Sequence, residues 1–204
     1  MIHALMLAFV AGIVTTLAGF GGGQLLVLGL AALWGPLAAL TATGPALLVG
    51  NLHRLWLFRA DVDRRASGVY ALGAFPGALV GGVTATVVPE RVLVGGMIGV
   101  AVLAVARHVL DPRHRVPVWL LGPGGAVVGF VAATGGGGGV LAAPLLLGTG
   151  MSRAAYVAAM ATGALAIHTG RMLGYASRGA MAPSDWALGL GLAVAIAAGN
   201  TVGR

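Results

Sequence analysis

Two arginines at matching positions in the two halves of the chain, Arg54 and Arg171, are the sharpest candidates for chemistry. Each is followed four residues later by an aromatic residue, Phe58 or Tyr175. The planar guanidinium of arginine binds oxyanions through a rigid fork of donors. The pair therefore predicts the lining of an anion path. The alternative is that both are ordinary arginines near a helix end, with their charge extended to an aqueous surface.

Asn51 and His168 also occupy matching positions, about one helical turn before the two arginines. Histidine changes its charge near neutral pH, so His168 is a candidate for proton coupling. The alternative for a lone histidine in an apolar segment is a hydrogen bond to a neighbouring helix. We predict that Asn51 and His168 belong to the same site as the arginines.

Two runs rich in glycine interrupt long apolar segments, at residues 19–23 and 135–139. A glycine costs roughly 1 kcal/mol relative to alanine in a helix interior, so both runs disfavour continuous helix. We predict two unwound segments, with the free amides at the start of each following half-helix attracting an anion. Close packing of small residues is the alternative. Packing, however, favours glycine at four-residue spacing rather than in runs.

Hydroxyl and amide side chains flank both glycine runs. They could ligate substrate oxygens or satisfy backbone groups freed by the breaks. The predicted substrate-binding residues are Thr15, Thr16, Gly19, Gly21, Gly22, Gly23, Gln24, Asn51, Arg54, Thr134, Gly136, Gly137, Gly138, Gly139, His168 and Arg171.

Glycine at four-residue spacing recurs elsewhere and predicts faces of close helix contact. The sets are Gly73, Gly77 and Gly81, then Gly95 and Gly99, Gly125 and Gly129, Gly170 and Gly174, and Gly199 and Gly203.

The residues that other kinds of chemistry require do not stand out in this sequence. A phosphate-binding P-loop ends in Gly-Lys-Ser/Thr, and the chain has no lysine. Its five acidic residues all lie at the ends of apolar segments, which removes paired acids for hydrolysis. No Ser-His-Asp set and no metal-ligand cluster stands out. We therefore predict no enzyme activity and no cofactor.

Composition places the chain in a membrane. It is 58% hydrophobic and only 8% charged, whereas soluble domains carry about 25% charged residues. Several apolar runs reach the roughly 18 residues that span a bilayer. The net charge of +7 comes from arginine alone, and in a membrane chain it indicates topology rather than nucleic-acid binding. No cysteine is present for disulfides or thiolate chemistry.

The apolar segments form two similar series. The expected segments are residues 2–34, 37–58, 68–88 and 92–109, then 117–150, 154–176 and one beginning near 183. We predict an all-α polytopic membrane protein of two homologous repeats with about four transmembrane helices each. The first helix of each repeat is broken at its glycine run, and the last helix is expected to be missing. The domains are then repeat one, 1–110, a cytoplasmic linker, 111–116, and a truncated repeat two, 117–204.

The arginines also predict a topology. They gather after the second, fourth and sixth apolar segments. If each broken segment crosses the membrane once, these clusters share one face, which the positive-inside rule makes cytoplasmic. The N-terminus and the mouth marked by Arg54 and Arg171 are then expected on that face too.

At the duplicated glycine element, 19–23 and 135–139, the chain resembles the sulfite exporter TauE/SafE family of bacterial membrane transporters. The resemblance also includes the apolar stretch from Gly137 to Pro144, and it covers nearly the whole chain. It implies a fold of four plus four helices. It further implies export of sulfite, sulfonates or related small organic anions.

We therefore expect a multi-pass secondary transporter of the bacterial inner membrane that moves a small anion. The residues support transport and an anion, while sulfur comes only from the resemblance. The expected partners are the lipid bilayer and the anionic substrate, with proton or other ion coupling and a homo-oligomer left open. A membrane-embedded enzyme and a non-transporting membrane scaffold are the alternatives.

Overall fold

The computed structural model describes residues 2–110 and 115–204, and within these residues it is helical and has no strand. Two 3-10 turns, Arg59–Asp61 and Val118–Leu120, accompany the α-helices. The α-helices are α1 (Ile2–Ala18), α2 (Gly22–Trp34), α3 (Pro36–Leu57), α4 (Arg64–Ala85), α5 (Glu90–Leu110), α6 (Leu121–Gly135), α7 (Gly138–Leu147), α8 (Arg153–Ser177) and α9 (Pro183–Val202).

Both glycine runs break a helix as predicted. Between α1 and α2, Gly19 and Gly21 have φ of 81° and 96°. Between α6 and α7, Gly136 and Gly137 have φ of 69° and 66°. L-residues with a side chain rarely adopt these values, so glycine alone makes the two reversals without strain.

The chain turns back at each break instead of continuing across. Gly22, at the start of α2, packs against the backbone of Ala11, and Gly29, further along, packs against Leu7. Residues later in α2 therefore contact residues earlier in α1, as in an antiparallel hairpin. The prediction that each broken segment crosses the membrane once is therefore wrong.

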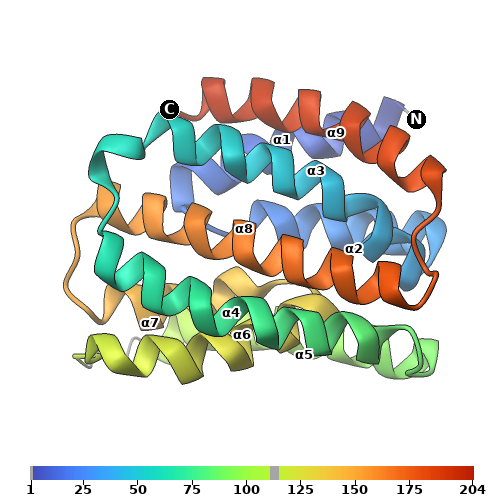
Figure 1. The fold of residues 1–204 in the computed structure, drawn as a ribbon. Helices are drawn as coiled ribbons and strands as arrows, with labels where there is room; N and C mark the ends of the chain where they lie inside the picture. The colour runs from blue at the N-terminus through green and yellow to red at the C-terminus, as the bar shows by residue number, and fades with distance from the viewer. Residues whose placement is uncertain (1, 111–114) are drawn as a thin grey trace.

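The second break has the same form. Gly138 packs against Ala132 and Val128, whereas Gly124, near the start of α6, packs against Leu145 of α7. The two hairpins enter from opposite ends of the molecule, α1–α2 from the right and α6–α7 from the left in Figure 1. Hydropathy alone does not distinguish a hairpin of two half-helices from one broken span.

The helices of the two halves pack across each other. Helix α4 lies against α6 and α8, while α9 lies against α1 and α3. Gly12 of α1 contacts the backbone of Ile196 and Asn200 on α9. Gly129 of α6 contacts the backbone of Ala74 and Ala78 on α4 in the same manner. The two hairpins thus each pack through a glycine against a long helix of the other half of the chain.

The predicted glycine contact faces are confirmed at all sets but one. Gly73 and Gly77 of α4 meet the backbone of Gly122 and Ala126 on α6, so that these helices touch without intervening side chains. The remaining confirmed contacts are those of Gly81, Gly125, Gly129, Gly170, Gly174, Gly199 and Gly203. The exception is the pair Gly95 and Gly99, where no atom of the described part of the chain lies near enough to contact an added side chain.

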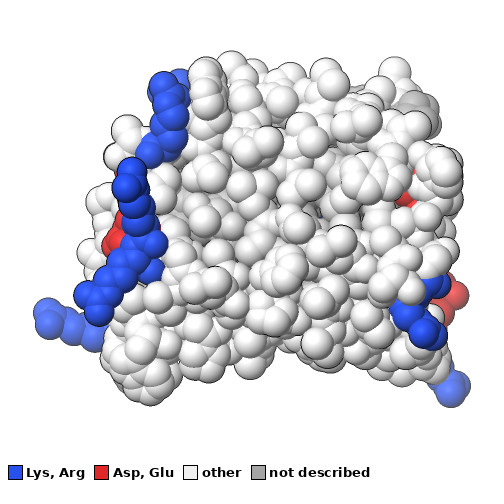
Figure 2. All heavy atoms as spheres, viewed as in Figure 1, with Lys and Arg blue, Asp and Glu red and all other residues white. Residues whose placement is uncertain are grey.

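The exterior suits a bilayer. Among the described residues, three helical stretches are long and apolar enough to cross a membrane, namely Arg64–Ala85, Val118–Gly135 and Pro183–Val202. The shorter apolar helices are α1, α2 and α7, which all belong to the hairpins. Figure 2 shows a wide uncharged band between two charged ends, with most of the basic atoms at the left.

Candidate anion-binding cavity

The tips of the two hairpins meet inside the molecule and enclose a cavity. Its volume is about 90 Å³, several times the roughly 10–15 Å³ that one buried water needs. The two breaks contribute Gly19, Phe20, Gly21, Gly23 and Gln24 from one side and Gly136 to Val140 from the other. Helices α3, α4 and α8 complete the wall. The cavity is thus built from both halves of the chain.

Two helix N-termini border this cavity. Helix α2 begins after Gly21 and α7 begins after Gly137, and neither has a side chain that caps its free amides. A helix N-terminus carries about half a positive charge, together with backbone N–H groups that no carbonyl satisfies. Both ends therefore favour an anion in the space between them.

Arg54 of α3 is buried, with 2% of its surface exposed. Its Nη1 donates to the carbonyl oxygens of Thr15 and Gly19 at 3.1 and 3.4 Å, and its Nη2 donates to Asn51 Oδ1 at 2.7 Å. These carbonyls belong to the C-terminal end of α1, where a positive charge is favourable. Its Nε has no partner.

Arg171 of α8 is equally buried, with 1% exposed, and also lines the cavity. Its hydrogen bond runs from Nη2 to Thr43 Oγ1 at 3.2 Å, and its Nε has no partner. Nearby, the hydroxyl of Tyr175 donates to the carbonyl of Ala133 at 2.6 Å, at the C-terminal end of α6.

Among the residues that the structure describes, no carboxylate lines the cavity to balance these two guanidinium groups. A buried charge without a partner is costly, by several kcal/mol even after the surroundings relax. Two such charges, beside two positive helix ends, make the cavity strongly attractive to a small anion. The acidic residues that the structure describes lie instead in loops or at helix starts.

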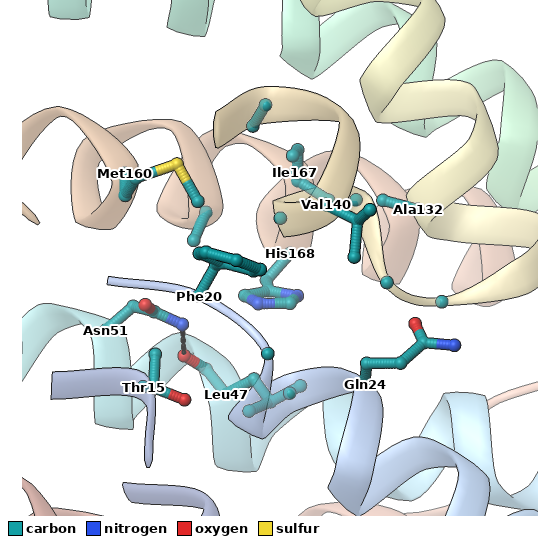
Figure 3. Close-up of a pocket in the computed structure, with 18 of the residues that line it drawn as sticks. Thr15, Phe20, Gln24, Leu47, Asn51, Ala132, Val140, Met160, Ile167 and His168 are labelled. Atoms are coloured by element: carbon teal, nitrogen blue, oxygen red, sulfur yellow. Dashed lines mark hydrogen bonds between the residues drawn. The ribbon is translucent and has the colours of Figure 1, made fainter. Parts of the chain in front are cut away.

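Three further polar side chains line the cavity. The amide of Gln24 is buried, and neither its Nε2 nor its Oε1 has a partner; Figure 3 shows it extending toward the break beside α7. His168 is 9% exposed, and its Nδ1 has no partner. Asn51 donates from Nδ2 to the carbonyl of Leu47 at 2.7 Å while it accepts from Arg54. Donors therefore remain free for a ligand.

Three of the predicted site residues lie outside the cavity wall. Thr16 donates to Asn200 Oδ1 of α9, which places it in a helix contact. Thr134 donates to carbonyls of its own helix, those of Phe130 and Val131. Gly22 lies against α1, with no room for a side chain. The other thirteen all line the cavity.

The alternative interpretation of the arginines is wrong. Neither extends its charge to a surface, since both are almost fully buried. Both line the same cavity, although they come from different ends of the fold. Arg54 lies near the end of α3 and Arg171 nearer the end of α8, and these two helices run in opposite directions.

Sequence reasoning missed several wall residues. Phe20 belongs to the first break, and Figure 3 shows its ring beside His168. Tyr70 of α4 is buried, and its hydroxyl has no partner. Met160 and Ile167 come from α8. For Tyr70 the sequence did offer a signal, because a tyrosine is unusual in the small-residue segment 68–88.

The fold and cavity define a helical membrane protein with a cationic interior site formed by two opposed hairpins. A family model described as Sulfite exporter TauE/SafE matches residues 4–204. The chain belongs to this family, which is a family of membrane transporters. Comparison with curated proteins and with solved structures gave no match.

Proposed function

We propose that the protein is a secondary transporter that moves a small oxyanion, sulfite or a related sulfur anion, across a bacterial inner membrane. One observation carries this proposal. Two buried guanidinium groups and two helix N-termini face one cavity, and the described residues of its wall include no carboxylate. The reason for naming a sulfur anion is the family description, Sulfite exporter TauE/SafE. Export is the direction that the family description names.

The arrangement also suits alternating access. We propose that residues 1–110 and 117–204 are inverted repeats, each contributing one hairpin and one arginine to the cavity. Transporters of this kind bind substrate near the bilayer midplane at broken helices and open to each side in turn. Of the proposed linker, 111–116, only residues 115 and 116 lie within the described residues.

The hairpins change the predicted sidedness. Among the described arginines, one end of the molecule carries Arg59, Arg64, Arg65, Arg115, Arg153 and Arg204, while the other carries Arg91 and Arg178. The first end is cytoplasmic by the positive-inside rule. The start of α1 then lies on the opposite side, in contrast to the expectation from single crossings.

Purified protein in proteoliposomes tests the function. Radiolabelled sulfite loaded into the proteoliposomes should leave faster than it leaves loaded liposomes that contain no protein. Unlabelled sulfite outside should accelerate this exit by exchange. Chloride and a neutral sugar serve as substrate controls. Flux equal to that of protein-free liposomes for every oxyanion tried would favour the scaffold alternative. Chemical conversion of the anion would favour the enzyme alternative.

A further inference from the structure

The two matched arginines make different contacts, and the difference has a cause in the sequence. We propose that Arg171 is the ligand of the oxyanion, whereas Arg54 is a positioning residue that holds the tip of the α1–α2 hairpin. This inference rests on the proposed function, because it assigns roles within that same cavity.

The guanidinium group of Arg54 is already hydrogen-bonded to groups of the protein. Three hydrogen bonds from its guanidinium group reach Thr15, Gly19 and Asn51. The carbonyl of Thr15 is among the last four of α1, which no amide of that helix can satisfy. Its charge is also partly balanced there by the negative end of the helix dipole. Removing Arg54 therefore leaves buried carbonyls unsatisfied and frees the hairpin tip.

At the equivalent end of α6 a tyrosine takes this role. Tyr175 donates its hydroxyl to the carbonyl of Ala133 at 2.6 Å. The matching residue in the first half is Phe58, which has no hydroxyl to donate. Because Tyr175 caps α6, Arg171 is not needed for that purpose.

Arg171 is consequently left with unused donors. Its guanidinium group lies beside the hydroxyl of Tyr175 and donates to Thr43, whose own hydroxyl donates to the carbonyl of Ala39 at 2.7 Å. That bond fixes one corner of the guanidinium group while Nε stays without a partner in the cavity wall. A buried, positioned and unbalanced guanidinium group suits an oxyanion, which can accept two parallel hydrogen bonds from it.

The two roles predict opposite effects on the ligand-free protein. A buried charge that lacks a partner destabilises the folded state, so replacing it with a neutral side chain relieves that cost. Without ligand, Arg171→Gln should melt at or above the parent temperature, and Arg54→Gln should melt about 4 °C or more below it. Adding sulfite should raise the melting temperature of the parent and of Arg54→Gln, but not that of Arg171→Gln.

Lysine variants separate charge from geometry. Arg54→Lys can still donate to the α1 carbonyls, so it should recover most of the lost melting temperature. Arg171→Lys keeps the charge but loses the planar fork, so sulfite binding should remain at least tenfold weaker than in the parent. Arg59→Gln, at an exposed arginine, is the neutral control.

The experiment is a thermal melt in detergent with sodium sulfite and, for comparison, sodium chloride. The division of roles is overturned if Arg171→Gln melts well below the parent without ligand. It is also overturned if Arg54→Gln loses the sulfite response while Arg171→Gln keeps it. Absence of any sulfite response in the parent would instead contradict the proposed function and the ligand role of Arg171 with it. The ligand-free order of melting temperatures would still decide whether Arg54 positions the hairpin.

Discussion

Gly139 and Phe20 bring the two halves of the molecule into contact at its centre. A side chain at Gly139 would place its Cβ 2.8 Å from the Cβ of Phe20, closer than such atoms approach. These residues are 119 positions apart in the sequence, and each lies within a few residues of a helix reversal. Whatever occupies the cavity therefore touches both hairpins at once.

The hairpin topology predicts a specific labelling pattern. Cysteines at Ala60 and Thr149 should both be protected from an impermeant thiol reagent in intact cells, whereas one at Arg178 should be labelled. The parent chain has no cysteine, so background is absent. A single crossing of the second broken segment would put Thr149 on the opposite side from Ala60. Labelling of Thr149→Cys with protection of Ala60→Cys would therefore contradict the hairpin.

Gly23→Ala should stabilise the protein and weaken anion binding at the same time. Gly23 lies in the first turn of α2, and an added Cβ would be 3.6 Å from Leu47, an ordinary contact. Alanine in a helix is favoured over glycine by about 0.4–1 kcal/mol. The methyl group, however, narrows the cavity beside the free amides, so we expect sulfite affinity to fall about tenfold.

Gly191→Ala is the matched control, since nothing lies near that position in α9. It should gain similar stability and bind sulfite normally. Calorimetric titration with sulfite, paired with thermal melts, distinguishes the two variants. Unchanged affinity in a stabilised Gly23→Ala would mean that the anion does not bind at the start of α2.

Gln24→Glu should abolish anion binding more completely than Gln24→Met. Glutamate places in the cavity a carboxylate that competes with the substrate for its cationic groups. Methionine merely removes a buried amide that has no partner, so we expect it to reduce affinity less. Equal affinities of both variants in a sulfite titration would show that the cavity does not select for negative charge.

His168→Gln tests proton coupling. If the imidazole carries the coupled proton, this variant should lose flux driven by a pH gradient and keep sulfite–sulfite exchange. Glutamine retains hydrogen-bonding groups at this buried position, which limits structural damage. The measurement is sulfite flux in proteoliposomes with and without a pH step. Parallel loss of both activities would assign His168 to substrate binding or to the structure instead.

Much of the site could be predicted from the sequence because its residues are unusual for a membrane helix. Glycine runs and arginines inside apolar segments are costly, so their presence required a reason, and the structure places both around one cavity. Thr134 looked equally suitable, yet a hydroxyl on a helix can simply donate to its own carbonyls, as this one does. Its position in the sequence does not show whether a hydroxyl lines the cavity or donates to its own helix.

The direction of the chain at each break could not be predicted in this way. An apolar stretch of the same length can form a broken span or a hairpin. The difference lies in the positive φ of Gly136 and Gly137 in the second break and of Gly19 and Gly21 in the first. The roles of Arg54 and Arg171 likewise depend on the Phe58 and Tyr175 difference, whose meaning requires the positions of α1 and α6.

The contact between Gly12 and Ile196 has a consequence for how the protein is made. Helix α1 leaves the ribosome well before its partner α9, which is synthesised almost two hundred residues later. At about 5–20 residues per second, that interval is on the order of ten seconds or more. During this time α1 lies in the membrane without α9 against its Gly12 face. We therefore expect newly made protein to be most sensitive to membrane proteases and insertion chaperones before α9 arrives.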